Sequence, residues 1–62
     1  MEELELLEQE YKRERADFIK LHGEKKWSIF FDKLDYDKLS EDAHERGIQI
    51  LELMQTESNR LQ

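Results

Sequence analysis

The sequence predicts an all-α protein, a small antiparallel bundle of three helices formed as one domain from residues 1–62. The first observation is composition: Leu, Glu, Lys, Gln and Arg dominate, while valine and proline are absent, so local propensity favours helix throughout. The second is that large apolar residues recur at helical spacing, unlike in a chain that cannot bury a core. The third is length, because 62 residues suffice for one domain at most.

The first helix is expected over residues 2–22. Three glutamates near its start and Lys20 and His22 at its end complement the helix dipole, and Gly23 suits the position just after a helix. At about 100° per residue, five apolar residues share one face. They are Leu4, Leu7, Tyr11, Phe18 and Leu21.

A second helix is expected over residues 24–38 and a third over residues 40–60. Ser40, followed by two acidic residues, is a suitable N-cap for the third. The expected core stripe of the second helix is Trp27, Phe30, Phe31 and Leu34. That of the third is Ala43, Gly47, Ile50, Met54 and Leu61, widened by Leu51 and Leu53.

One variant of this fold remains open, because no glycine or proline separates the second helix from the third. They could form one helix of about 36 residues, giving a helical hairpin with a long second arm. That arm would span about 54 Å, against about 30 Å for the first helix. The unmatched end would need a partner from another chain.

Self-association is expected in either variant. A domain of this size buries only about 60% of the surface that its unfolded chain exposes, so its stability is marginal. The chain has no cysteine, which excludes disulfides and thiolate zinc sites as supports. The remaining support is assembly into a larger helical bundle, most simply a twofold homodimer.

The charge distribution argues against nucleic acid and membranes as partners. The net charge is −6, and only residues 11–26 carry more basic than acidic side chains. Nonspecific binding to DNA, RNA or anionic lipid depends on a basic surface. No stretch approaches 18 consecutive apolar residues, and the start of the chain is acidic, unlike a targeting signal. These features predict a cytoplasmic protein.

Neither a metal or cofactor site nor an enzymatic activity is expected. Five acidic residues between 32 and 42 suggest a calcium loop, but an EF-hand needs Gly at the sixth position and Glu at the twelfth. Counted from Asp35, these positions hold Ser40 and Arg46. His44 and Glu45 begin an H-E-x-x-H pattern that Ile48 breaks. The sequence has no Gly-rich phosphate loop, and no serine stands beside a candidate base.

Residues 39–54, LSEDAHERGIQILELM, resemble the centre of a DNA-binding helix-turn-helix. In that motif a small residue such as Ala43 allows close packing, and a glycine such as Gly47 makes the turn. The helix that would enter the groove begins Gln-Ile-Leu-Glu, where polar or basic contacts are needed. A helix-turn-helix regulator is therefore the alternative function.

The principal hypothesis is a non-enzymatic protein-interaction module, acting as a regulator, inhibitor or adaptor. Its partner would be another protein, a second copy of itself, or both, bound through apolar helix faces with an acidic rim. One expected face carries Ile29, Lys33 and Tyr36, opposite the core stripe of the second helix; the other carries Ile48, Leu51 and Met54. The simpler interpretation of Ile29 and Tyr36 is that they are scattered surface residues.

Overall fold

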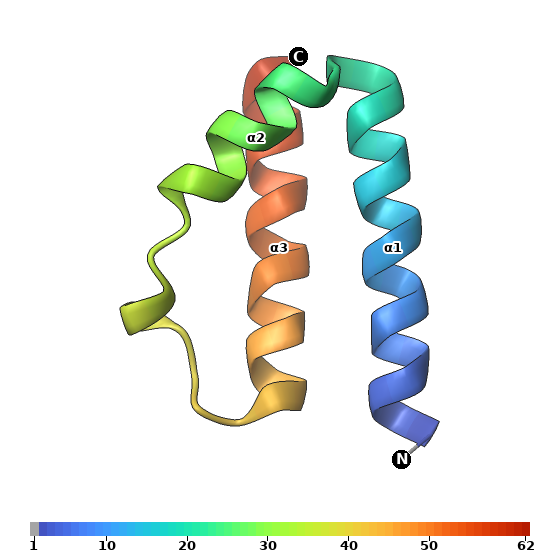
Figure 1. The fold of residues 1–62 in the computed structure, drawn as a ribbon, viewed down its shortest axis with the longest axis vertical. Helices are drawn as coiled ribbons and strands as arrows, with labels where there is room; N and C mark the ends of the chain where they lie inside the picture. The colour runs from blue at the N-terminus through green and yellow to red at the C-terminus, as the bar shows by residue number, and fades with distance from the viewer. Residues whose placement is uncertain (1) are drawn as a thin grey trace.

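The computed structural model of this chain describes residues 2–62 and confirms the small all-α, three-helix fold. The elements are α1 (Glu2–His22), α2 (Glu24–Lys33), a short 3₁₀ helix η1 (Tyr36–Lys38) and α3 (Ala43–Leu61). Figure 1 shows α1 and α3 side by side, with both helices running upward. α2 begins near the top of α1 and descends obliquely to the segment that connects it to α3. The chain therefore runs up, down and up again.

The bounds predicted for the first helix are confirmed by α1, which covers Glu2–His22. Gly23 ends it with φ at 95°, and its N–H donates to the Ile19 carbonyl at 2.7 Å. The expected burial of Leu21 is wrong, since that side chain is 60% exposed. Arg15 of α1 lies over the Trp27 ring of α2, so the Arg15 side of α1 faces α2. Ile19, one turn after Arg15, lies on that side and packs against the core in place of Leu21.

The second helix is shorter than predicted and ends at Lys33 rather than at residue 38. Leu34 has an extended backbone, and the Asp35 carboxylate accepts a hydrogen bond from the Asp37 N–H at 3.2 Å. Short acidic side chains offer the backbone such local hydrogen bonds in competition with helix. The chain breaks here, so the variant with one long continuous helix is wrong.

The third helix begins at Ala43, and its N-cap is Asp42 rather than the predicted Ser40. The Asp42 carboxylate accepts a hydrogen bond from the Glu45 N–H at 2.9 Å. Ser40 lies before the helix, where its hydroxyl accepts from the Asp42 N–H at 3.1 Å. The Ser40 N–H donates to the Gln49 side chain at 2.8 Å, which ties the connecting segment to α3.

The core lies where the three helices meet, and Phe18 is its centre. The Phe18 ring centroid is 5.6 Å from that of Trp27 and 5.9 Å from that of Phe30. Phe31, expected in the core, is 37% exposed, because it lies on the flank of α2 rather than on the face toward α1 and α3. The buried apolar residues are Phe18, Trp27, Phe30, Leu34, Leu51 and Met54.

Gly47 lies inside α3, which continues through it without a turn. The turn that the resemblance to a helix-turn-helix places at Gly47 is therefore absent from this segment. The glycine serves close packing instead. The Leu7 side chain of α1 lies where a Cβ atom would stand, with Leu7 Cγ at 3.0 Å from that position.

Substitution of Gly47 by alanine should change stability little in the native chain, although alanine favours helix over glycine by about 1 kcal/mol. The added methyl group forces Leu7 to move, which offsets the gain. In a Leu7→Ala background the obstacle is gone, so Gly47→Ala should stabilise by about 1 kcal/mol. Urea unfolding of the four variants measures this coupling. If Gly47→Ala changed the free energy of unfolding equally in the native chain and in the Leu7→Ala chain, the contact between Leu7 and Gly47 would be contradicted.

Candidate functional site

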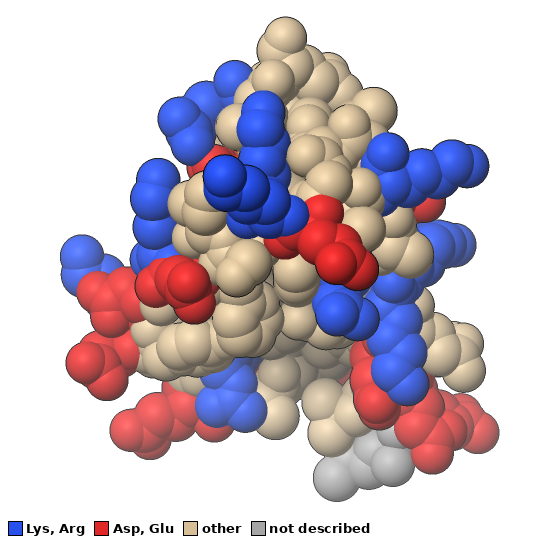
Figure 2. All heavy atoms as spheres, turned by 45° about the horizontal axis from the view of Figure 1, so that its top comes forward, with Lys and Arg blue, Asp and Glu red and all other residues tan. Residues whose placement is uncertain are grey.

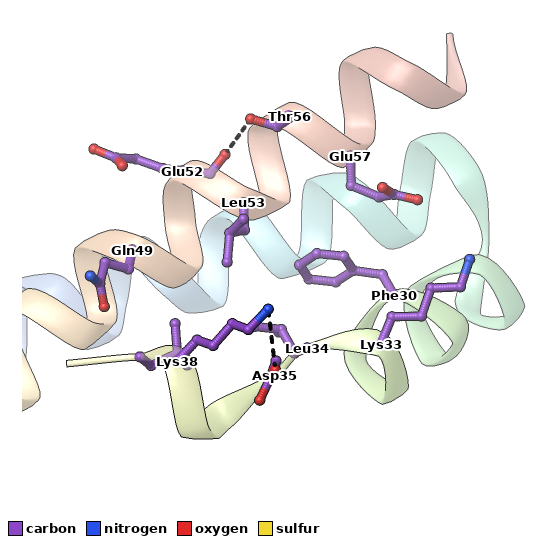
Figure 3. A pocket seen from close by; sticks show the side chains of 11 residues that line it. Phe30, Lys33, Leu34, Asp35, Lys38, Gln49, Glu52, Leu53, Thr56 and Glu57 are labelled. Carbon is purple, nitrogen blue, oxygen red and sulfur yellow. Dashed lines mark hydrogen bonds and ion pairs between the residues drawn. The ribbon is translucent and has the colours of Figure 1, made fainter. Parts of the chain in front are cut away.

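A groove lies between α2 and the connecting segment on one side and α3 on the other (Figure 3). Its volume is about 620 Å³. Leu34 and Leu39 contribute apolar surface from the connection, Phe30 from α2 and Leu53 from α3. Leu53 is 43% exposed there. We call this space the α2–α3 groove.

The early end of α2 makes this groove possible. The backbone is extended at Leu34 and Asp35, so the chain leaves α2 there. The residues that follow pass beside α3 as a connecting segment instead of continuing α2 along it. The hydrogen bond between Ser40 and Gln49 holds the far end of this segment against α3. Between these two points the side chains of α3 remain only partly covered.

The rim of the α2–α3 groove carries charges of both signs, and three of its five charged lining side chains are acidic. Lys38 pairs with Asp35 at 3.8 Å, while Glu57 binds Arg60 through both carboxylate oxygens. The hydrogen bond from Arg60 lowers the pKa of the Glu57 carboxyl, against a small opposing effect of burial. Glu57 is therefore ionised at neutral pH. Glu52 and Lys33 complete the charged lining.

Of the first predicted face, only Lys33 lines the groove. Ile29 and Tyr36, 44% and 50% exposed, do not share a helix face, because α2 ends before residue 36. Tyr36 packs its ring against Phe31, with centroids 5.9 Å apart. Phe31 and Ile29 stand about 160° apart around α2. Ile29 therefore lies on one side of α2, and Tyr36 packs against the other side through Phe31, so the two do not form the single face expected from the sequence.

Two of the three residues of the second predicted face are buried in the structure. Ile48 is 39% exposed, but Leu51 and Met54 are 7% and 1% exposed and belong to the core. Residues three apart on a helix share a face, and this face of α3 is the one that packs against the other helices. Leu51 and Met54 are therefore occupied within the chain.

A second hollow, of about 480 Å³, lies between α1 and α2 and was not expected from the sequence. Tyr11 and Trp27 approach edge to face, with centroids 6.3 Å apart, and Phe31 lies 5.7 Å from Trp27. Burial raises the pKa of the Tyr11 phenol, the nearby phenol of Tyr36 raises it further, and Arg15 lowers it. We call this space the α1–α2 hollow.

Neither space resembles a metal centre. Within residues 2–62, no three His, Asp or Glu side chains lie close enough together to hold a metal ion. His22, one of the two histidines, instead forms a hydrogen bond with Ser58 at 2.9 Å and links the ends of α1 and α3. A serine therefore does lie beside a histidine, contrary to the expectation from the sequence, because residues 36 apart in the chain meet where α1 and α3 end. None of the helices in the described part of the chain is long and apolar enough to cross a membrane.

Comparisons of the chain with protein-family models, with curated proteins and with solved structures found no match.

Proposed function

We propose that the protein is a non-enzymatic interaction module that binds a segment of another protein in the α2–α3 groove. The observation that carries this proposal is the partly exposed apolar lining around Leu53, beside a chain segment that leaves it uncovered. Concave apolar surfaces with a few charged groups are the usual sites for such binding. The module would act as a regulator, inhibitor or adaptor.

The partner segment would present one large apolar side chain to the groove. Covering a Leu side chain contributes about 1.5–3 kcal/mol when burial is complete, and Leu53 has nearly half its surface left to bury. A groove of about 620 Å³ has room for an anchor residue and its neighbours. This is the arrangement of a central anchor surrounded by a polar rim.

Basic residues should flank that anchor. Asp35, Glu52 and Glu57 line the groove together with two lysines, and Arg60, which pairs with Glu57, lies outside the lining. The whole chain carries a net charge of −6. Complementary charge on the partner speeds association and excludes acidic competitors. The predicted ligand is therefore a segment with a large apolar residue between lysines or arginines.

Selection from a phage-displayed library of random peptides tests this prediction. We expect enrichment of peptides with an apolar anchor and net positive charge. Their affinity should fall about tenfold or more with Leu53→Glu, which removes the apolar contact and places another acid in the groove. Ile48→Glu is the matched control, because Ile48 is exposed to a similar degree on α3 but does not line the groove.

Equal losses in the two variants, or selected peptides without a shared anchor and charge, would contradict the proposal.

Self-association is part of the same hypothesis, since a second copy is one candidate partner. Sedimentation equilibrium of the protein alone distinguishes this case by a mass of twice the 7.6 kDa monomer. A dimer dispersed by Leu53→Glu but not by Ile48→Glu would identify the second copy as the occupant of the groove.

A further inference from the structure

The α1–α2 hollow differs from the α2–α3 groove in both lining and charge. Its apolar surface is aromatic and comes from Tyr11, Trp27 and Phe31, while its charged side chains are Glu8, Lys12 and Arg15. We propose that this hollow is a second binding site, which takes an acidic peptide segment carrying an aromatic anchor. The site is independent of the function proposed for the α2–α3 groove, which has an acidic rim.

The aromatic lining is continuous. Ring centroids lie 6.3 Å apart for Tyr11 and Trp27, 5.7 Å for Trp27 and Phe31, and 5.9 Å for Phe31 and Tyr36. Phe31 and Tyr36 are 37% and 50% exposed, so the outer part of this row is open to a ligand. Aromatic side chains prefer edge-to-face or offset contacts at such spacings, which a Phe side chain of a partner can extend.

Arg15 supplies the charge that selects an acidic ligand. Its guanidinium carbon lies 5.8 Å from the centroid of the Trp27 ring, so the cation is held at the hollow. Lys12 pairs with Glu8 at 3.4 Å, whereas Arg15 has no carboxylate within 4.0 Å among the residues that the structure describes. A guanidinium in this position can donate two hydrogen bonds to one carboxylate.

The chain segment that carries Tyr11, Lys12 and Arg15 has the same sign. Residues 11–26, which form most of α1 and the beginning of α2, carry six basic and three acidic side chains. Figure 2 shows Lys and Arg around the end of the molecule that comes forward, with some Asp and Glu among them, while many Asp and Glu lie toward the lower edge. An acidic ligand is therefore attracted to this part of an otherwise acidic protein.

Nucleic acid fits the hollow less well than a peptide. Single strands bind by stacking their bases on open aromatic faces. Trp27 is only 8% exposed and packs against Phe18 and Phe30, so its ring has little free surface on which a base could stack. The exposed rings, Phe31 and Tyr36, contact each other edge to face at the open side and suit one side chain packed against the pair.

The fluorescence of Trp27, the only tryptophan of the chain, reports binding directly. The probe is the acetylated and amidated pentapeptide Glu-Glu-Phe-Glu-Glu, compared with versions in which alanine replaces Phe or lysine replaces each Glu. We expect a saturable change in emission with the first peptide, and at least about tenfold weaker binding by the other two. No saturable change at millimolar peptide would overturn the proposal.

Two variants with the same charge change locate the site. Arg15→Glu should weaken binding about tenfold or more, while Arg13→Glu, about 160° away around α1, should have a much smaller effect. Arg15→Gln removes the charge without reversing it and should also weaken binding. Circular dichroism checks that each variant is folded. Equal losses for Arg13→Glu and Arg15→Glu, or tighter binding of a single-stranded dT oligonucleotide than of the peptide, would overturn the proposal.

Discussion

Phe18→Ala is expected to leave the chain largely unfolded at room temperature. Phe18 is 3% exposed, and its ring packs against Trp27 and Phe30 at the point where α1 meets α2. Removing a buried Phe side chain costs about 3–5 kcal/mol. A single core in a protein of this size supplies only about 3–5 kcal/mol in total. Loss of the helical circular dichroism signal and of the cooperative urea transition would show the effect.

Leu21→Ala is the matched control for this prediction, since it shortens an apolar side chain one turn further along the same helix. Leu21 is 60% exposed, so its truncation should change the free energy of unfolding by no more than about 0.5 kcal/mol. If both variants unfolded, or both stayed as stable as the native chain, the position of α1 against α2 would be wrong.

Met54→Ala should be nearly as damaging. Met54 is 1% exposed, the most deeply buried side chain of the core, and it lies on the face of α3 that packs against the other helices. Truncation of a buried methionine costs about 2–5 kcal/mol, which is comparable to the whole stability of a domain this small. Chemical and thermal unfolding followed by circular dichroism measure the loss.

Leu53→Ala, one residue earlier, separates a core position from a surface position on the same helix. Leu53 is 43% exposed, so the variant should remain folded and lose less than about 1 kcal/mol. The comparison of Met54→Ala with Leu53→Ala also decides whether Met54 is a core residue or an interface residue. If Met54→Ala weakened association while the monomer stayed stable, Met54 would be an interface residue after all.

The extent of the first helix, with its end at His22, could be predicted from the sequence, because several independent signals coincide there. The charges at both ends complement the helix dipole, and Gly23 adopts the positive φ that favours glycine after a helix. Its buried face was predicted less well. The apolar stripe shows which residues can be buried, but the position of α2 decided that Ile19 packs and Leu21 does not.

The break between α2 and α3 was predicted near residue 39, but its length was underestimated because it contains neither glycine nor proline. The signals that produce it are polar: Asp35 caps η1, and Asp42 caps α3. Asp42 followed three residues later by Glu45 is the spacing of a capping box, and it could have been preferred over Ser40. Local hydrogen bonding by short acidic side chains decides the ends of both helices.

The α2–α3 groove and the contact of Tyr36 with Phe31 beside the α1–α2 hollow follow from this break and could not be derived from helix periodicity alone. The α2–α3 groove exists because the chain leaves α2 at Leu34, and Leu53 lines it only because no helix covers that side of α3. Tyr36 reaches Phe31 because it no longer belongs to α2. A wheel drawn for one helix through residue 38 places Tyr36 beside Ile29 instead.

The central claim, that a partner binds in the α2–α3 groove, is tested most directly by NMR of ¹⁵N-labelled protein. The titrant is the tightest peptide from the library selection. The groove predicts the largest amide shift changes around Lys38, Leu39 and Leu53, with small changes at Leu6 and Ile48. Largest changes at Leu6 and Ile48, with the groove residues unmoved, would contradict the claim.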